Sequence, residues 1–143
     1  MDANLLIDQL RQSLEQKPCI LAVEDHEDNL LLISYLIQSL DCRLITATNG
    51  IEGLLLAKQH LPNLILLNMV MPEMNGVTMI HRLKQNSLTS HIPVVAVTGL
   101  ALAEELDCII EAGCDAYLTK PYMLRDLEAM IHYYLYQHSI VKL

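Results

Sequence analysis

Residues 64–76 read LILLNMVMPEMNG, and this stretch decides the fold. The run from Leu64 to Leu67 is short and uniformly apolar, which is typical of a strand covered on both faces in a parallel sheet. The run ends at Asn68, and a loop that contains Pro72 and Gly76 follows. The stretch therefore predicts a buried strand whose carboxyl end carries a polar side chain.

The same alternation continues on both sides of this strand. Short apolar runs predict further strands, and apolar residues at helical spacing predict helices between them. Gly50 belongs to a turn, and Gly113 ends a helix. The predicted strands are 19–23, 43–47, 64–67, 93–97 and 116–119. The predicted helices are 3–16, 29–40, 51–60, 77–85, 102–112 and 123 to about 138.

Five strands that alternate with helices predict βαβ units, and therefore an α/β fold with a parallel sheet and helices on both faces. The extra helix at 3–16 has apolar residues at Leu6, Leu10 and Leu14, and Lys17-Pro18 closes it. This helix packs back on the domain, pairs with a second copy or acts as a linker. We expect an N-terminal extension at 1–17, the main domain at 18–138 and a tail at 139–143.

Composition and charge exclude several classes of protein. The chain has 143 residues, of which 52% are hydrophobic, and this suits one domain with a substantial core. A net charge of −8 argues against non-specific binding to nucleic acid and against docking on anionic membranes. No signal peptide is apparent, and no apolar stretch approaches the ~20 residues of a membrane span. We expect a cytoplasmic monomer or homodimer.

The cysteines form no metal-binding pattern. Cys19, Cys42, Cys108 and Cys114 make no CxxC pair, and the histidines make no HExxH pair. We expect the four cysteines to be buried, reduced thiols.

Polar side chains follow four of the predicted strands, and ligands in an open parallel sheet bind at such carboxyl ends. Two carboxylates hold a hard cation such as Mg²⁺ through oxygen ligands. A hydroxyl and an ammonium group contact the oxygens of a phosphoryl group. The residues at these ends are Glu24-Asp25, Asn68, Thr98-Gly99 and Lys120-Pro121.

In this order, the four motifs resemble the CheY-like receiver domain of response regulators, over about residues 18–138. That family has an acidic pair, a phosphoacceptor aspartate in a D-x-x-x-P-x-x-x-G loop, a Thr or Ser, and a Lys-Pro pair. The resemblance implies a doubly wound, flavodoxin-like sheet of strand order 2-1-3-4-5. It also implies that Lys120-Pro121 is a candidate for a cis peptide bond.

The resemblance also implies the role of each site residue. Mg²⁺ would be held by Asp25 directly and by Glu24 through water, with the Asn68 side chain and the Val70 carbonyl as the other protein ligands. Thr98 and Lys120 would contact the phosphoryl group and shift when it arrives. Tyr117, three positions before the lysine, would report that shift to the surface.

Asn68 departs from the family, because an amide stands where the family has its phosphoacceptor aspartate. An amide oxygen is neutral and a far poorer nucleophile than a carboxylate oxygen. We therefore expect a pseudo-receiver that is not phosphorylated at this position, with a weak or absent Mg²⁺ site because one negative charge is lost. Lys120, without its anionic partner, would turn to Asp25 or to the Asn68 oxygen. The residue is native, or it was introduced into a phosphorylatable receiver; the sequence allows both.

The expected function is that of a stand-alone response regulator in two-component or phosphorelay signalling, and not of an enzyme. Its partners would be a histidine kinase or phosphotransfer protein and a downstream effector, docked on residues 101–137 beside acids such as Glu104, Glu105 and Asp107. A small enzyme or nucleotide-binding protein on a flavodoxin-like sheet is the alternative, although no glycine-rich phosphate motif follows a strand. A structural unit that dimerises through the N-terminal helix is a third possibility.

Overall fold

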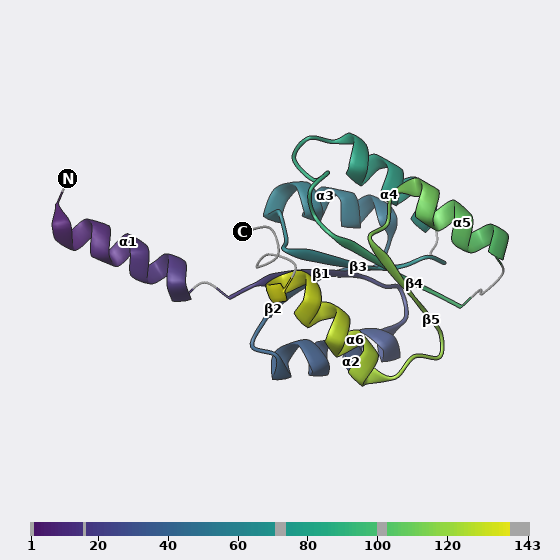
Figure 1. Ribbon diagram of the computed structural model, residues 1–143, viewed down its shortest axis with the longest axis horizontal. Helices are drawn as coiled ribbons and strands as arrows, with labels where there is room; N and C mark the ends of the chain where they lie inside the picture. The colour runs from purple at the N-terminus through teal and green to yellow at the C-terminus, as the bar shows by residue number, and fades with distance from the viewer. Residues whose placement is uncertain (1, 16, 71–73, 100–102, 138–143) are drawn as a thin grey trace.

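A five-stranded parallel sheet forms the centre of the protein, in strand order β2-β1-β3-β4-β5 (Figure 1). The computed structural model describes residues 2–15, 17–70, 74–99 and 103–137. The strands are β1 (Cys19–Val23), β2 (Arg43–Ala47), β3 (Leu64–Asn68), β4 (Val94–Thr98) and β5 (Ala116–Thr119). The α/β fold and the strand order that the resemblance implied are confirmed.

Two layers of helices cover the sheet (Figure 1). One face carries α3 (Gly50–His60), α4 (Gly76–Gln85) and α5 (Ala103–Ala112). The other face carries α2 (Glu27–Ser39) and α6 (Leu124–His132), and α6 continues into the π-helical turn η1 (Tyr133–Gln137). Because both faces are covered, every residue of β1, β3 and β4 is buried.

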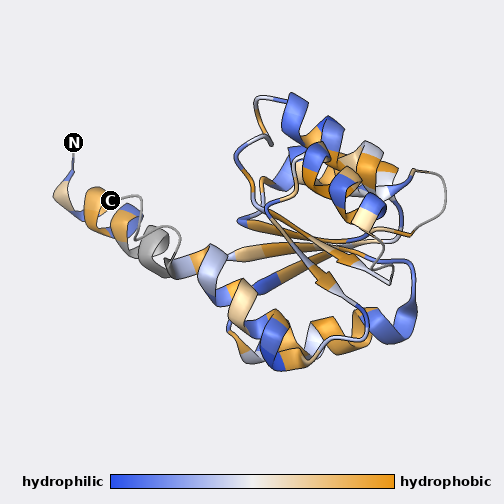
Figure 2. Cartoon of the chain, turned by 45° about the vertical axis from the view of Figure 1, so that its right-hand side comes forward, coloured by the Kyte–Doolittle hydropathy of each residue, from blue (hydrophilic) through white to orange (hydrophobic). Residues whose placement is uncertain are grey.

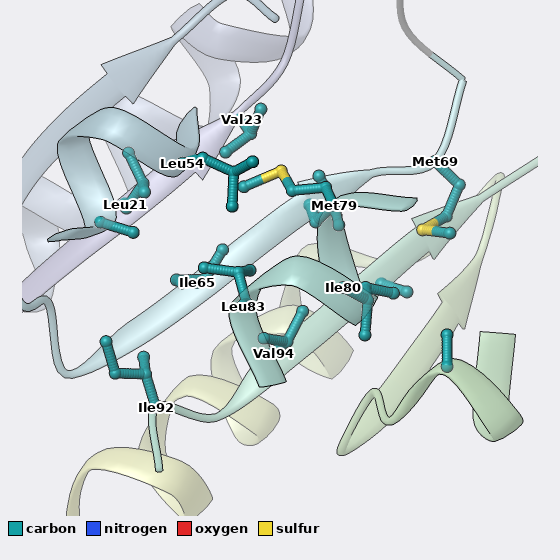
Figure 3. Close-up of a cluster of buried hydrophobic side chains, with 14 of the residues drawn as sticks. Leu21, Val23, Leu54, Ile65, Met69, Met79, Ile80, Leu83, Ile92 and Val94 are labelled. Carbon is teal, nitrogen blue, oxygen red and sulfur yellow. The ribbon is translucent and has the colours of Figure 1, made fainter. Parts of the chain in front are cut away.

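The larger hydrophobic cluster lies on the α3–α4–α5 side of the sheet (Figure 3). Strand residues such as Leu21 and Ile65 share it with Met79, Ile80 and Leu83 of α4, all of them fully buried. The three α4 residues recur at helical spacing, so one face of the helix is apolar. Each such side chain contributes about 1.5–3 kcal/mol through burial, and this packing holds the strand ends in fixed positions.

Most observed boundaries differ from the predicted ones by one or two residues, for local chemical reasons, whereas the last α-helix ends at His132 and continues as π-helix instead of running to about residue 138. Helix α2 begins at Glu27 rather than at residue 29, because Glu27 and Asp28 are acidic and favourable in a first turn. Strand β4 begins at Val94 rather than at Pro93, which has no N–H to donate to a neighbouring strand. Strand β3 extends through Asn68, so this residue is held by the sheet.

Helix α1 (Ala3–Glu15) extends away from the sheet and its helical layers (Figures 1 and 2). Its apolar side chains Leu5, Leu6, Ile7 and Leu10 are all exposed. Packing back on the domain is therefore not observed, which leaves pairing with another copy or a linking role. None of the described helices is both long and apolar enough to cross a membrane.

The expectation of four buried thiols is only partly correct. Cys19 and Cys42 are buried, but Cys108 is exposed and Cys114 is half-buried, and all four are free. Cys108 lies outward because α5 turns Ile109 and Ala112 to the core instead. Burial raises the pKa of Cys19, Cys42 and Cys114 above the usual value, so these thiols stay protonated at neutral pH.

Candidate functional site

The side chains at the carboxyl edge of the sheet come from several strand ends. Glu24 and Asp25 follow β1, Asn68 is the last residue of β3, and Thr98 is the last residue of β4. Lys120 follows β5, and its backbone N–H donates to the Thr98 carbonyl at 2.7 Å. The parallel register aligns these ends, and hydrogen bonds or ion pairs join Glu24, Asp25, Asn68 and Lys120 into one group.

Glu24 is a buried carboxylate with partners on every side, and only 3% of the residue is exposed. Its oxygens accept hydrogen bonds from Asn29 Nδ2 and Asn68 Nδ2, both at 2.8 Å, and from the His26 backbone N–H at 3.3 Å. Lys120 Nζ lies 3.8 Å from Glu24 Oε1. Burying a carboxylate without such partners would cost folding free energy. Glu24 therefore depends on Asn29, Asn68 and Lys120 and holds their side chains near one another.

The Asn68 amide stands at the centre of the group. Its Nδ2 donates to Glu24 Oε2 at 2.8 Å, to the Val70 carbonyl at 3.0 Å and to Asp25 Oδ1 at 3.3 Å. On the other side, Asn68 Oδ1 accepts from Lys120 Nζ at 3.4 Å and, at the long limit of 3.5 Å, from the Val70 N–H. Acceptors around the nitrogen and donors around the oxygen fix the amide orientation.

Lys120 reaches the site as the sequence predicted. Of its two expected partners, the structure shows the Asn68 oxygen, and it adds a longer ion pair with Glu24. The Lys120-Pro121 peptide bond is cis, as the resemblance implied. The lysine side chain is one-third exposed, so its ammonium group faces both the buried carboxylate and solvent.

The remaining predicted site residues differ in burial and in position. Thr98 is buried at the end of β4, with 2% of its surface exposed. Val70 contributes its backbone, while its side chain points to solvent and is 64% exposed. Tyr117 lies on the edge strand β5 and is 38% exposed. Pro72 falls outside the described residues.

Two residues of the site were missed from the sequence. Asn29, in the first turn of α2, donates to Glu24, and Tyr122 lines a small cavity with Glu24 and Asn68. Burial raises the pKa of the Tyr122 phenol, and the Glu24 carboxylate adds to that effect. Asn29 lies five positions after Glu24 and Tyr122 two after Lys120; such proximity to a strand end is the only sequence signal for either residue.

Gly76 is required where the loop after β3 returns to the sheet. A Cβ at this position would lie 2.9 Å from Met69 Cα and 2.6 Å from the end of the Met69 side chain. The backbone segments are close because the Gly76 N–H donates to the Met69 carbonyl at 3.3 Å. Glycine is the residue that permits this approach, and it sets where α4 begins.

The fit of a divalent cation depends on the Asn68 amide. The Glu24 and Asp25 carboxylates and the Val70 carbonyl are oxygen donors of the kind that Mg²⁺ prefers. All three, however, accept from Asn68 Nδ2. The described residues contain no group of three His, Cys, Asp or Glu side chains that could hold a metal ion. A cation would therefore fit only if the amide turned its oxygen towards it, away from Lys120.

Comparison with known proteins yields a family and several similar structures. Residues 20–132 match the family model of the response regulator receiver domain. The polar-differentiation response regulator DivK of Brucella anthropi is 39% identical over 102 residues, which cover 71% of this chain and 83% of DivK.

Two solved structures of response regulators are similar to this chain. A CheY-like receiver domain protein from Methanospirillum hungatei is 28% identical with a TM-score of 0.76, covering 81% of this chain and 91% of its own. The Mn²⁺-bound form of response regulator Rcp1 is 29% identical with a TM-score of 0.69, covering 80% and 88% respectively.

Proposed function

Because the chain belongs to the response regulator receiver domain family, we propose that it acts in two-component or phosphorelay signalling as a pseudo-receiver that docks on partner proteins without being phosphorylated at Asn68. The family is one of signalling domains and not of metabolic enzymes. The partners are a histidine kinase or phosphotransfer protein and a downstream effector, and the location is cytoplasmic. The free cysteines support a reducing compartment.

The observation that carries this proposal is the set of hydrogen bonds from Asn68 Nδ2 to Glu24, Asp25 and the Val70 carbonyl. A phosphoacceptor needs a nucleophilic oxygen, whereas Asn68 offers a neutral amide whose oxygen already accepts from Lys120. The NH₂ group also supplies partial positive charge to both carboxylates. The amide thus takes the place of the nucleophile and offsets part of the charge that a cation would neutralise.

Weak binding of Mg²⁺ is part of the proposal. Asp25 and Glu24 would hold the ion directly and through water, and the Asn68 oxygen and the Val70 carbonyl would complete the protein ligands. When bound, the ion would supply positive charge that stabilises negative oxygens at this edge of the sheet. Asn68 would have to give up three donor contacts first, so the affinity is low.

The same pocket would result from an Asp-to-Asn change introduced into a phosphorylatable receiver. In that case Thr98 and Lys120 are still competent to contact a phosphoryl group. Their position at the same edge of the sheet supports this reading. Restoring the carboxylate at position 68 tests whether the rest of the site is competent, because only an otherwise complete site gains phosphorylation.

The surface proposed for partner docking comprises α5, β5 and α6. Glu104 and Asp107 are exposed, Glu105 is half-buried, and Tyr117 lies at the edge of the sheet. This acidic surface suits a basic partner surface. Tyr117 would report changes at Thr98 and Lys120 to that partner, since it lies on the strand that leads to the lysine. Ala101, where the predicted surface begins, falls outside the described residues.

Incubation with acetyl phosphate and Mg²⁺, followed by intact-mass spectrometry, tests the proposal. The chain as it stands should gain no phosphoryl group, and the Asn68→Asp variant should gain one that is labile to acid if the rest of the site is competent. Asn75→Asp is the matched control, because it adds the same charge nearby but at the N-cap of α4. That control should gain none.

An acid-labile phosphate on the unaltered chain would contradict the proposal. Digestion and mapping of the modified peptide exclude deamidation of Asn68 as its source, because deamidation restores an aspartate.

A further inference from the structure

A second polar pocket lies at the opposite, amino edge of the sheet. It includes the segment that joins α1 to β1, whose course Figure 1 shows. Its volume is about 260 Å³. It is formed by the segment before β1, the first residue of β2 and the loop between α3 and β3. The pocket is smaller than a drug-sized site of about 300–1,000 Å³, so it suits a small ligand.

Three short hydrogen bonds hold the floor of this pocket. The Arg43 N–H donates to the Pro18 carbonyl, and the Asn63 N–H donates to the Cys19 carbonyl, both at 2.8 Å. The Cys19 N–H donates to Asn63 Oδ1, also at 2.8 Å. Because the Asn63 oxygen is the acceptor, its Nδ2 remains available as a donor. The backbone of the pocket is therefore held in place by hydrogen bonds, and Asn63 Nδ2 is one more donor among its lining residues.

The lining residues supply hydrogen-bond donors and no acid. Lys17, Arg43, His60 and Asn63 line the pocket, and no Asp or Glu is among its lining residues. This concentration of basic groups occurs in a chain of net charge −8 with only nine Lys and Arg residues. A preformed hollow lined by basic side chains and by no carboxylate fits an anion.

Only one of these basic groups is occupied by an ion pair among the described residues. Lys17 Nζ lies 2.9 Å from Asp41 Oδ1, with side chains that are 53% and 81% exposed. Such an exposed ion pair contributes little to stability, so Lys17 can leave Asp41 for another anion. Arg43 has no carboxylate partner within the described parts of the chain, and its charge already acts on the neighbouring Cys19 thiol.

We propose that this pocket binds a small phosphate-class dianion, such as inorganic phosphate or a small phosphate monoester, between Arg43, Lys17 and His60. The guanidinium group supplies the planar, bidentate contact that a phosphate favours. Lys17 adds a point charge, and His60 and Asn63 add directional N–H donors. The site is separate from the Asn68 group, because the two lie at opposite ends of the strands.

Titration of the ¹⁵N-labelled full chain with inorganic phosphate, at constant ionic strength and without Mg²⁺, tests this assignment. We expect saturable chemical-shift changes at the backbone amides of Cys19, Leu61 and Asn63. Arg43→Gln should weaken binding about tenfold or more, because it removes charge-assisted hydrogen bonds. His60→Gln provides a second variant with a smaller expected loss.

Lys58→Gln is the matched control. It removes one positive charge from the same helix as His60, but Lys58 lines a different groove. We expect its affinity for phosphate to stay within about twofold of the unaltered chain. Shifts that do not saturate, or an equal loss in Lys58→Gln and Arg43→Gln, would overturn the assignment.

Discussion

At the carboxyl edge of the sheet the charged side chains bind one another, whereas at the amino edge basic side chains surround a hollow that contains no acid. Glu24 alone accepts from Asn29, Asn68 and the His26 backbone. Arg43, at the other edge, has no ion-pair partner among the described residues. The two regions lie at opposite ends of the same sheet.

Only the carboxyl-edge site satisfies its own polar atoms. At the carboxyl edge, the Asn68 amide supplies donors to the carboxylates and an acceptor to Lys120. That group needs neither a cation nor a phosphoryl group to satisfy its polar atoms. At the amino edge, the side-chain N–H groups of Arg43 and Asn63 have no protein acceptor among the described residues, so solvent or a ligand meets them. Ligand dependence is therefore expected at the edge that the family does not use for signalling.

The largest expected effect is the loss of the buried carboxylate in Glu24→Ala. This change leaves Asn29 Nδ2 without its acceptor, takes one of three acceptors from Asn68 Nδ2, and removes the ion pair of Lys120. Breaking a buried, paired charge costs about 3 kcal/mol of unfolding free energy. Urea denaturation followed by circular dichroism measures that loss.

Arg43→Ala is the counterpart at the amino edge and should change the unfolding free energy by no more than about 0.5 kcal/mol. Asp25→Ala, which removes an exposed carboxylate from the same group as Glu24, should also have a small effect. Equal losses in Glu24→Ala and Arg43→Ala would show that the two edges do not differ as described.

A smaller effect is expected from Tyr122→Phe. Burial, with help from Glu24, raises the pKa of Tyr122 above 10.0. The unfolded phenol therefore loses its proton first, and stability falls as the pH rises through about 10. Without the phenol, the loss of unfolding free energy between about pH 8 and about pH 10.5 should shrink by a few tenths of a kcal/mol.

Tyr35→Phe is the control for this measurement, because Tyr35 is 75% exposed on the outer face of α2. Tyr35→Phe should leave the loss of unfolding free energy at alkaline pH unchanged. An identical profile for Tyr122→Phe and the unaltered chain would remove Tyr122 from the carboxyl-edge group.

Sequence patterns predicted the fold well because short apolar runs in the sequence indicate buried strands. The apolar stretch at β3 and the turn residues around it determine a covered strand that ends at Asn68. Helix α1 was harder to predict, because the spacing of Leu6 and Leu10 identifies an amphipathic helix but not what covers it. Cys108 was wrongly expected to be buried, since an apolar run does not reveal which side of α5 faces the core.

The candidate site was predictable only where a residue stands at a strand end. Glu24, Asn68 and Lys120 could be named because parallel strands bring their carboxyl ends together. The direction of the Asn68 amide could not be predicted, since it depends on the donors and acceptors around it. The amino-edge pocket was not foreseen either, because Lys17, Arg43 and His60 are far apart in sequence and belong to no motif.

A calorimetric Mg²⁺ titration of the unaltered chain beside Asn68→Asp measures whether the Asn68 amide takes the place of a charged acceptor and weakens the cation site. The variant adds a third carboxylate and removes the NH₂ group that now donates to Glu24, Asp25 and Val70. We predict that Asn68→Asp binds Mg²⁺ at least about tenfold more tightly, while the Asn75→Asp control does not. Equal affinities for the unaltered chain and Asn68→Asp would show that the Asn68 amide does not weaken the cation site.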